Sequence, residues 1–97
     1  MVTAICLAKV KPQRVSEAAD EVSRIEGVSA VYSVGGQYDL VVVLRARDSE
    51  GLVDAVTRRI LKIDGILDTE TMIASRVHAS EDLERMFSIG LDNPDEH

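Results

Sequence analysis

The chain has 97 residues, a formal net charge of −6 and an isoelectric point near 4.8. This length accommodates one small domain, and 45% hydrophobic with 29% charged residues is an ordinary globular composition. Nucleic-acid binding draws most of its affinity from Lys and Arg, so 17 acidic against 11 basic residues disfavour it. A short basic group, Arg58, Arg59 and Lys62, is flanked by Asp54 and Asp64 and indicates a solvated helix face with an Asp54–Arg58 pair.

The single cysteine, Cys6, allows no disulfide within the chain and favours a reducing compartment. Its neighbours Ile5 and Leu7 indicate a buried, unreactive thiol. No run approaches the roughly 18–20 apolar residues of a membrane span. The N-terminus lacks the basic region of a secretory signal. We therefore expect a cytoplasmic protein with no membrane partner.

Two strand–helix–strand units are predicted in chain order. Strands are expected at residues 4–10, 29–34, 40–46 and 67–77, and helices at 15–25 and 48–63. Both helices carry an apolar stripe of 3.6-residue period. Pro12 lies near the start of the first helix, and Asp48 or Ser49 is a good N-cap for the second. Gly27 and Gly65 stand just past the helix ends, where glycine is typical.

Two such units with right-handed crossovers predict an α+β, ferredoxin-like βαββαβ sandwich. This is a four-stranded antiparallel sheet with both helices on one face. Residues 4–8 and 40–44, on the two central strands, are continuously apolar, whereas a strand covered on one face should alternate. We therefore expect a second copy to cover the other face in an isologous homodimer. The alternative is a monomer with an exposed apolar patch.

The domain is expected to span residues 1–79, with a short C-terminal helix and acidic tail at 80–97. Ser80 is a suitable N-cap, and Gly90 a suitable stop. Leu83, Met86 and Phe87 would form a short apolar stripe on this helix, which a neighbouring subunit could cover.

Catalytic and metal-binding patterns are absent from the sequence. The only histidines are His78 and His97, and no Cys, His or acidic spacing resembles a zinc or iron site. No glycine-rich loop precedes a helix as phosphate-binding motifs require. The central strands carry no aromatic residue, which argues against an RNA-recognition module of this fold. We expect a non-enzyme without metal or cofactor, and an enzyme site assembled between subunits is the less favoured alternative.

Two segments together resemble a known family. They are I-E-G-V-S-A-V-Y-S-V-G-G-Q-Y-D-L-V-V-V-L at 25–44 and I-D-G-I-L-D-T-E-T at 63–71. The combination of G-x-Y-D with G-[VI]-x-x-T-x-T resembles the effector-binding domain of Lrp/AsnC regulators, also called RAM, for regulation of amino acid metabolism. The resemblance covers Thr3 to about Val77.

This resemblance implies a dimer, assembled further into rings of dimers, that binds an amino acid at interfaces between subunits. Full-length regulators carry a DNA-binding helix-turn-helix before this domain. Here Met1 leads directly into the first strand, so we expect a stand-alone form without direct nucleic-acid binding.

The loop Gly35-Gly36-Gln37-Tyr38-Asp39 is the predicted ligand site. Backbone amides of the two glycines are accessible to a carboxylate because no Cβ obstructs them. Asp39 could accept from an ammonium group, and Tyr38 could wall the pocket and contribute its hydroxyl. The alternatives are purely local: the glycines serve a wide hairpin turn, and Asp39 bonds the turn's own amides.

By the same resemblance, Thr69 and Thr71 would complete the site from the same or another subunit. Their alternative explanation is the preference of threonine for strands.

Two functions follow. The first is an amino-acid-sensing regulatory module whose ligand shifts its assembly or its pairing with a DNA-binding relative. The second is a structural subunit that joins full-length Lrp/AsnC regulators and binds nothing small.

Overall fold

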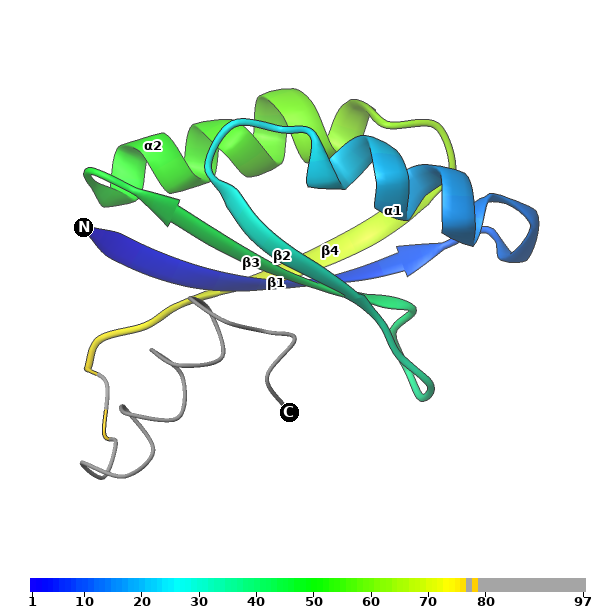
Figure 1. Cartoon of the computed structure of the whole chain (residues 1–97), viewed down its shortest axis with the longest axis horizontal. Coiled ribbons are helices and arrows are strands. Elements are labelled where there is room, and N and C mark those ends of the chain that lie inside the picture. Colours follow the sequence, from blue (N-terminus) through cyan, green and yellow to red (C-terminus); the bar gives the residue numbers. More distant parts are fainter. Residues whose placement is uncertain (77, 79–97) are drawn as a thin grey trace, which may run out of the picture.

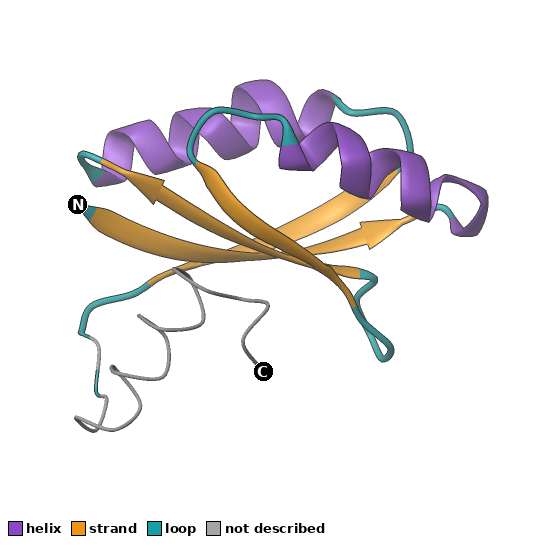
Figure 2. Cartoon of the chain, in the orientation of Figure 1, coloured by secondary structure: helices purple, strands orange, loops and turns teal. Residues whose placement is uncertain are grey.

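The four predicted strands form one antiparallel sheet with all helical segments on a single face (Figures 1 and 2). The computed structural model describes residues 1–76 and 78, so the expected C-terminal helix lies outside the described residues. The strands are β1 Val2–Val10, β2 Val28–Ser33, β3 Leu40–Ala46 and β4 Ile66–Ile73, in the sheet order β2-β3-β1-β4. The helical segments are a 3₁₀ turn Pro12–Arg14, α1 Val15–Ser23, and α2 Ser49–Asp54, which continues as Ala55–Arg59 and Ile60–Lys62. The ferredoxin-like prediction is confirmed, with β1 and β3 as the central strands.

The core lies between the sheet and the helices. Alternate residues of the central strands are buried there: Ala4, Cys6, Ala8 and Val10 of β1, and Leu40, Val42 and Leu44 of β3. They pack against one apolar stripe from each helical segment: Ala18 and Val22, and Leu52, Val56 and Ile60. Every second residue of a strand faces the helices, as strand geometry requires, although the apolar runs themselves do not alternate.

The second helix differs from the prediction, because it is not α-helical throughout. After α2 the chain widens into a π-helical turn, Ala55–Arg59, and then tightens into a 3₁₀ turn, Ile60–Lys62. The buried side chains Leu52, Val56 and Ile60 are spaced by four residues. In an α-helix of 3.6 residues per turn, this spacing would rotate each successive side chain further around the helix axis. A wider turn keeps them aligned on the sheet. Thr57 Oγ1 also donates to the Val53 carbonyl at 2.8 Å, a bond that loosens helices.

β4 is shorter than predicted, ending at Ile73 instead of residue 77. As an edge strand it pairs only with β1, with Ala4 opposite Ile73. Ala74 N still donates to Thr3 O at 2.8 Å, after which β1 offers almost no further partner. The start of β1 therefore sets the end of β4.

The predicted local signals at the helix ends are confirmed. Gly27 and Gly65 have φ of +96° and +99°, the left-handed region that favours glycine. Asp48, not Ser49, is the N-cap of α2, and its side chain accepts from Gly51 N at 2.8 Å. Asp54 and Arg58 form the expected i,i+4 ion pair at 2.8 Å.

The sheet face away from the helices is apolar at its centre. The apolar residues of the strands that point to this side are Ile5, Leu7, Ala30, Tyr32, Val41, Val43 and Met72. We call this set the open face. Tyr32 and Met72 are 58% and 46% exposed. The continuous apolar runs thus serve two faces, one of which no described residue covers.

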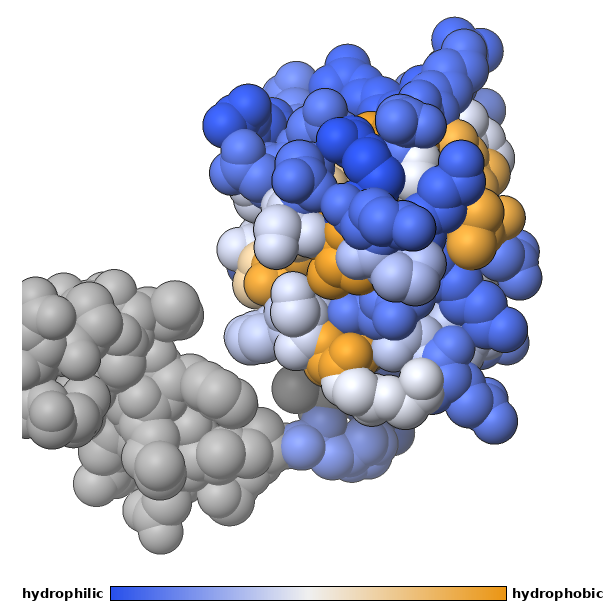
Figure 3. Space-filling view, turned by 90° about the vertical axis from the view of Figure 1, so that its right-hand side faces the viewer, coloured by the Kyte–Doolittle hydropathy of each residue, from blue (hydrophilic) through white to orange (hydrophobic). Residues whose placement is uncertain are grey.

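Viewed from the end that carries the β2–β3 loop, apolar patches interrupt an otherwise hydrophilic surface (Figure 3). Within residues 1–76 and 78, no helix is long and apolar enough to cross a membrane.

Cys6 is fully buried on the helix side of β1, as predicted. Burial raises the pKa of its thiol above the usual 9.0, and a hydrogen bond with Thr71 opposes that rise. The unfolded chain therefore ionises at a lower pH than the folded one. Below about pH 9 the thiol is protonated in both the folded and the unfolded chain, so it leaves the free energy of unfolding unchanged.

Above about pH 9, ionisation of Cys6 in the unfolded chain is expected to lower the free energy of unfolding, by at most about 1.4 kcal/mol per pH unit. Urea unfolding of the parent and of Cys6→Ala between about pH 7 and pH 10 measures this. Cys6→Ala should show the shallower decline above pH 9. Identical slopes in the two proteins would contradict the expectation.

Candidate functional site

The β2–β3 loop, residues 34–39, projects beyond one end of the sheet (Figure 1). Its base is closed by Val34 N donating to Asp39 O at 2.9 Å, and Asp39 N donates to Ala8 O at 2.9 Å. Gly36 has a φ of +128°, whereas the φ of Gly35 is not positive. No other group lies within 4 Å of the Cβ position of either glycine. The backbone at the loop tip is therefore open to an incoming group.

The side chain of Asp39 does not bond the amides of its own turn. Its Oδ2 accepts from Val10 N at 2.8 Å, on another strand and not within its own turn. β3 pairs with β1 only up to Leu40 opposite Ala8, so the carboxylate takes the place of the next ladder bond. An ionised carboxylate has about four acceptor positions. The second oxygen, Oδ1, thus retains acceptor capacity.

Tyr38 lies across the end of the open face and joins the loop to β1 and β4. Its hydroxyl donates to Glu70 Oε2 at 3.3 Å, and Lys9 Nζ lies 5.7 Å from its ring centroid. Desolvation, the negative charges of Glu70 and Asp68, and the bond to Glu70 raise the pKa of Tyr38 above its usual value. The hydroxyl therefore stays protonated and acts as a donor.

The predicted threonines lie on the opposite side of the sheet from Tyr38. Thr69 is opposite Ala8 and Thr71 is opposite Cys6, so both share the helix face with those buried residues. Glu70, between them, is on the open face. The seven predicted residues therefore form two groups, one in the loop at the end of the sheet and one on the helix side of β4.

The loop residues Gly35 to Asp39 form the first group and the threonines the second. Gln37, in the first group, is exposed and makes no hydrogen bond within the described part of the chain.

The residues that hold the loop in place were not predicted from the sequence. Glu70, Lys9 and the amide of Val10 all contact loop side chains, and Asp68 contributes charge. A signal for Glu70 was present, because the middle residue of T-E-T must face away from both threonines in a strand. Val10 carried no such signal, since its side chain is an ordinary core residue.

Topology and register place the chain among the small ferredoxin-like α+β sandwiches. A sequence profile described as "Lrp/AsnC ligand binding domain" matches residues 3–83. The chain therefore belongs to the Lrp/AsnC family.

Its relatives include the HTH-type transcriptional regulator FL11 of Pyrococcus furiosus, 35% identical over 79% of this chain and 50% of the relative. The chain thus spans about half the length of the curated relatives that it matches.

Solved structures of the same fold include TTHA0845 from Thermus thermophilus. It is 39% identical, with a TM-score of 0.79 over 82% of this chain and 100% of that one. The feast or famine regulatory protein Rv3291c of M. tuberculosis, complexed with L-methionine, has a TM-score of 0.70. It is 23% identical over 84% of this chain and 54% of that one, a likeness of fold alone.

Proposed function

We propose that the chain is an amino-acid-sensing regulatory module that acts in transcriptional regulation through its assembly. The observation that carries this is the geometry of the β2–β3 loop. Gly35 and Gly36 leave backbone open for a carboxylate, and Asp39 Oδ1 retains acceptor capacity for an ammonium group. The L-methionine complex of Rv3291c supports an amino acid as the effector.

The assembly that we propose is a homodimer formed by two open faces. A soluble protein rarely leaves such an apolar area uncovered, and a second copy offers a matching surface. The two groups of predicted site residues, on opposite faces of one sheet, support a binding site that a second subunit completes. Further closure of dimers into a ring would bring such interfaces together.

We further propose that the module is non-enzymatic, cytoplasmic and able to work without a DNA-binding half of its own. TTHA0845 supports this last point, because the domain accounts for the whole of that chain. DNA would then be read by a full-length Lrp/AsnC regulator that pairs with the module. The net charge of −6 agrees with this division.

Asp39→Asn is expected to abolish amino-acid binding and leave the fold intact. The side-chain carbonyl of asparagine still accepts from Val10 N, but the charge that attracts an ammonium group is gone. A screen of the twenty amino acids by thermal shift identifies the effector. At a hundred times its dissociation constant, the effector should stabilise the parent by about 2.7 kcal/mol, a rise on the order of 10 °C.

Asp64→Asn is the matched control, since Asp64 is an exposed carboxylate outside the loop. It should bind as the parent does. If Asp39→Asn retains parental affinity for the effector in calorimetry, the site assignment is wrong.

The second candidate is a structural subunit that joins full-length regulators and binds no small molecule. The bond from Val10 N to Asp39 favours it, because the carboxylate then already has a structural role. Co-purification with a tagged full-length relative, together with no thermal shift from any amino acid, would establish this function. Failure to mix with such relatives would exclude it.

A further inference from the structure

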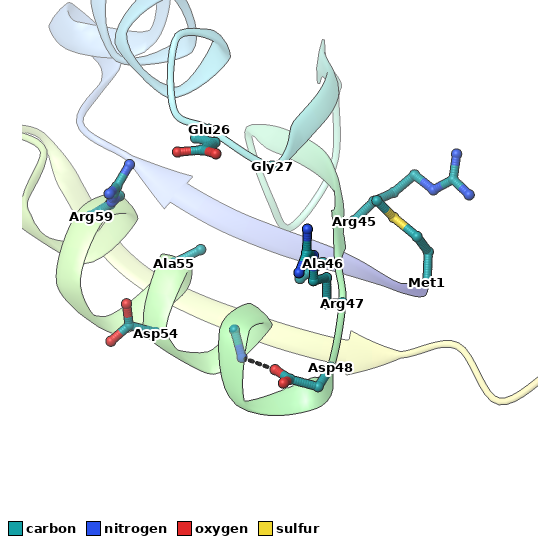
Figure 4. Close-up of a pocket in the computed structure, with 11 residues that line it drawn as sticks. Met1, Glu26, Gly27, Arg45, Ala46, Arg47, Asp48, Asp54, Ala55 and Arg59 are labelled. Carbon is teal, nitrogen blue, oxygen red and sulfur yellow. Dashed lines mark hydrogen bonds between the residues drawn. The ribbon is translucent and has the colours of Figure 1, made fainter.

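A second concave region lies at the opposite end of the sheet from the β2–β3 loop (Figure 4). It has a volume of about 580 Å³. Its walls are the turn between α1 and β2, the end of β3 with the turn that follows, and one flank of α2 with its continuation. Small-molecule sites typically enclose about 300–1,000 Å³. The region, which we call the α2 cavity, is large enough for a metabolite.

Small residues keep the α2 cavity open. Gly27, Ala46, Gly51 and Ala55 line it without long side chains. A Cβ at Gly27 would lie 3.1 Å from the Arg45 carbonyl oxygen, and one at Gly51 would lie 3.3 Å from Ala46 Cβ. The elements therefore approach closely at their backbones, and the space between their side chains stays empty.

Three arginines border this cavity, Arg45 and Arg47 at the end of β3 and Arg59 on the continuation of α2. Figure 4 shows Arg59 on the helical wall and Arg47 on the β3 side, whereas the side chain of Arg45 extends away from the cavity. Each ion pair among the described residues uses other cations, namely Arg14, Arg24 and Arg58.

Two of the three carboxylates in the cavity already have partners. Asp54 pairs with Arg58 at 2.8 Å, and Asp48 caps α2 through Gly51 N at 2.8 Å. Glu26, on the turn before β2, is the third, and no hydrogen bond or ion pair among the described residues involves it. Arg47 and Arg59 thus outnumber Glu26, the carboxylate of the cavity that has no partner among the described residues.

We propose that the α2 cavity binds a small organic phosphate that carries at least two negative charges. A guanidinium group presents a planar fork of N–H donors that matches phosphate oxygens in a bidentate geometry. Arg47 and Arg59 hold the phosphate groups from the two walls. Glu26 accepts from an amino or hydroxyl group of the organic part. This site is independent of the amino-acid site at the other end of the sheet.

Calorimetric titration of the full chain with ADP, pyrophosphate and citrate tests the proposal. We expect one saturable ADP or pyrophosphate site per chain at about 50 mM NaCl, weakened but still present at about 200 mM. Arg47→Gln and Arg59→Gln should each weaken binding on the order of tenfold. Arg24→Gln, which removes the same charge from α1's end, should leave it within about twofold.

Glu26→Gln tests the proposal in the opposite direction, by an expected gain in affinity. Removing this carboxylate should tighten pyrophosphate binding, because the anion then meets less repulsion, whereas Glu17→Gln on the exposed side of α1 should not. Circular dichroism establishes that each variant is folded. The titrations then report on the site alone.

Three results would overturn the proposal. The first is a folded parent that shows no saturation by ADP or pyrophosphate up to about 1 mM. The second is equal weakening by Arg24→Gln, which would show general charge attraction. The third is saturable binding of citrate without either phosphate, which would assign the cavity to carboxylates.

Discussion

Ile5→Glu is expected to convert the proposed dimer into a monomer. Ile5 lies at the centre of the open face, opposite Val43 on one side and Met72 on the other, and is still 37% exposed within one chain. A two-fold interface buries this position twice, so each dimer would bury two unpaired carboxylates. We expect dissociation to become at least roughly a thousand-fold easier, measured by light scattering and sedimentation over a range of concentrations.

Val53→Glu is the control for this experiment. Val53 is an apolar residue of α2 and 51% exposed, but it belongs to the helix layer. The same change of chemistry there should leave the assembly unaltered. A parent protein that sediments as a monomer at micromolar concentration, or dissociation by both variants alike, would refute an interface on the open face.

Gly65→Ala is expected to lower the free energy of unfolding by about 2–4 kcal/mol. Gly65 closes the second helical segment with a φ of +99°, which a residue with a Cβ adopts only under strain. Its added Cβ would also lie 2.6 Å from Arg14 Cβ, near the backbone of a residue that is already anchored. Arg14 is held by Glu21 and by the Asp64 carbonyl, both at 3.1 Å. Urea unfolding at a fixed protein concentration measures the loss.

Gly35→Ala is the corresponding change at a glycine that carries neither constraint. Its φ is not positive and nothing lies within 4 Å of the new atom. We expect a change within about 1 kcal/mol in either direction. Equal losses in the two variants would show that the contact with Arg14 relaxes without cost.

Much of the fold follows from local patterns in the sequence. Two uninterrupted apolar strands predict the sheet centre and its two apolar faces, and the glycines at 27 and 65 mark the turns after each helix. These features are predictable because each depends on a few neighbouring residues. The end of β4 and the π-helical turn are not, since the first depends on where β1 begins and the second on the spacing of side chains against the sheet.

The candidate site was predictable in its location but not in its contacts. The sequence G-G-Q-Y-D predicts a loop with open backbone, which the structure has. The bond from Val10 N to Asp39 joins residues 29 positions apart, and that from Tyr38 to Glu70 joins residues 32 apart. Each exists only because β1 runs between β3 and β4. A local pattern could show that Glu70 faces away from the threonines, but not that it contacts Tyr38.

β4 has consequences for how such domains diversify. Its odd-numbered residues from Thr69 to Ile73 share the helix side, while Asp68, Glu70 and Met72 share the other. A substitution in one row therefore leaves the side chains on the other face of the sheet unchanged. Substitutions in the even row would change the surface offered to the proposed second copy and the support of Tyr38 by Glu70, while the odd row stays on the helix side. An edge strand of eight residues can therefore change the side chains on one face of the sheet while those on the other face are kept.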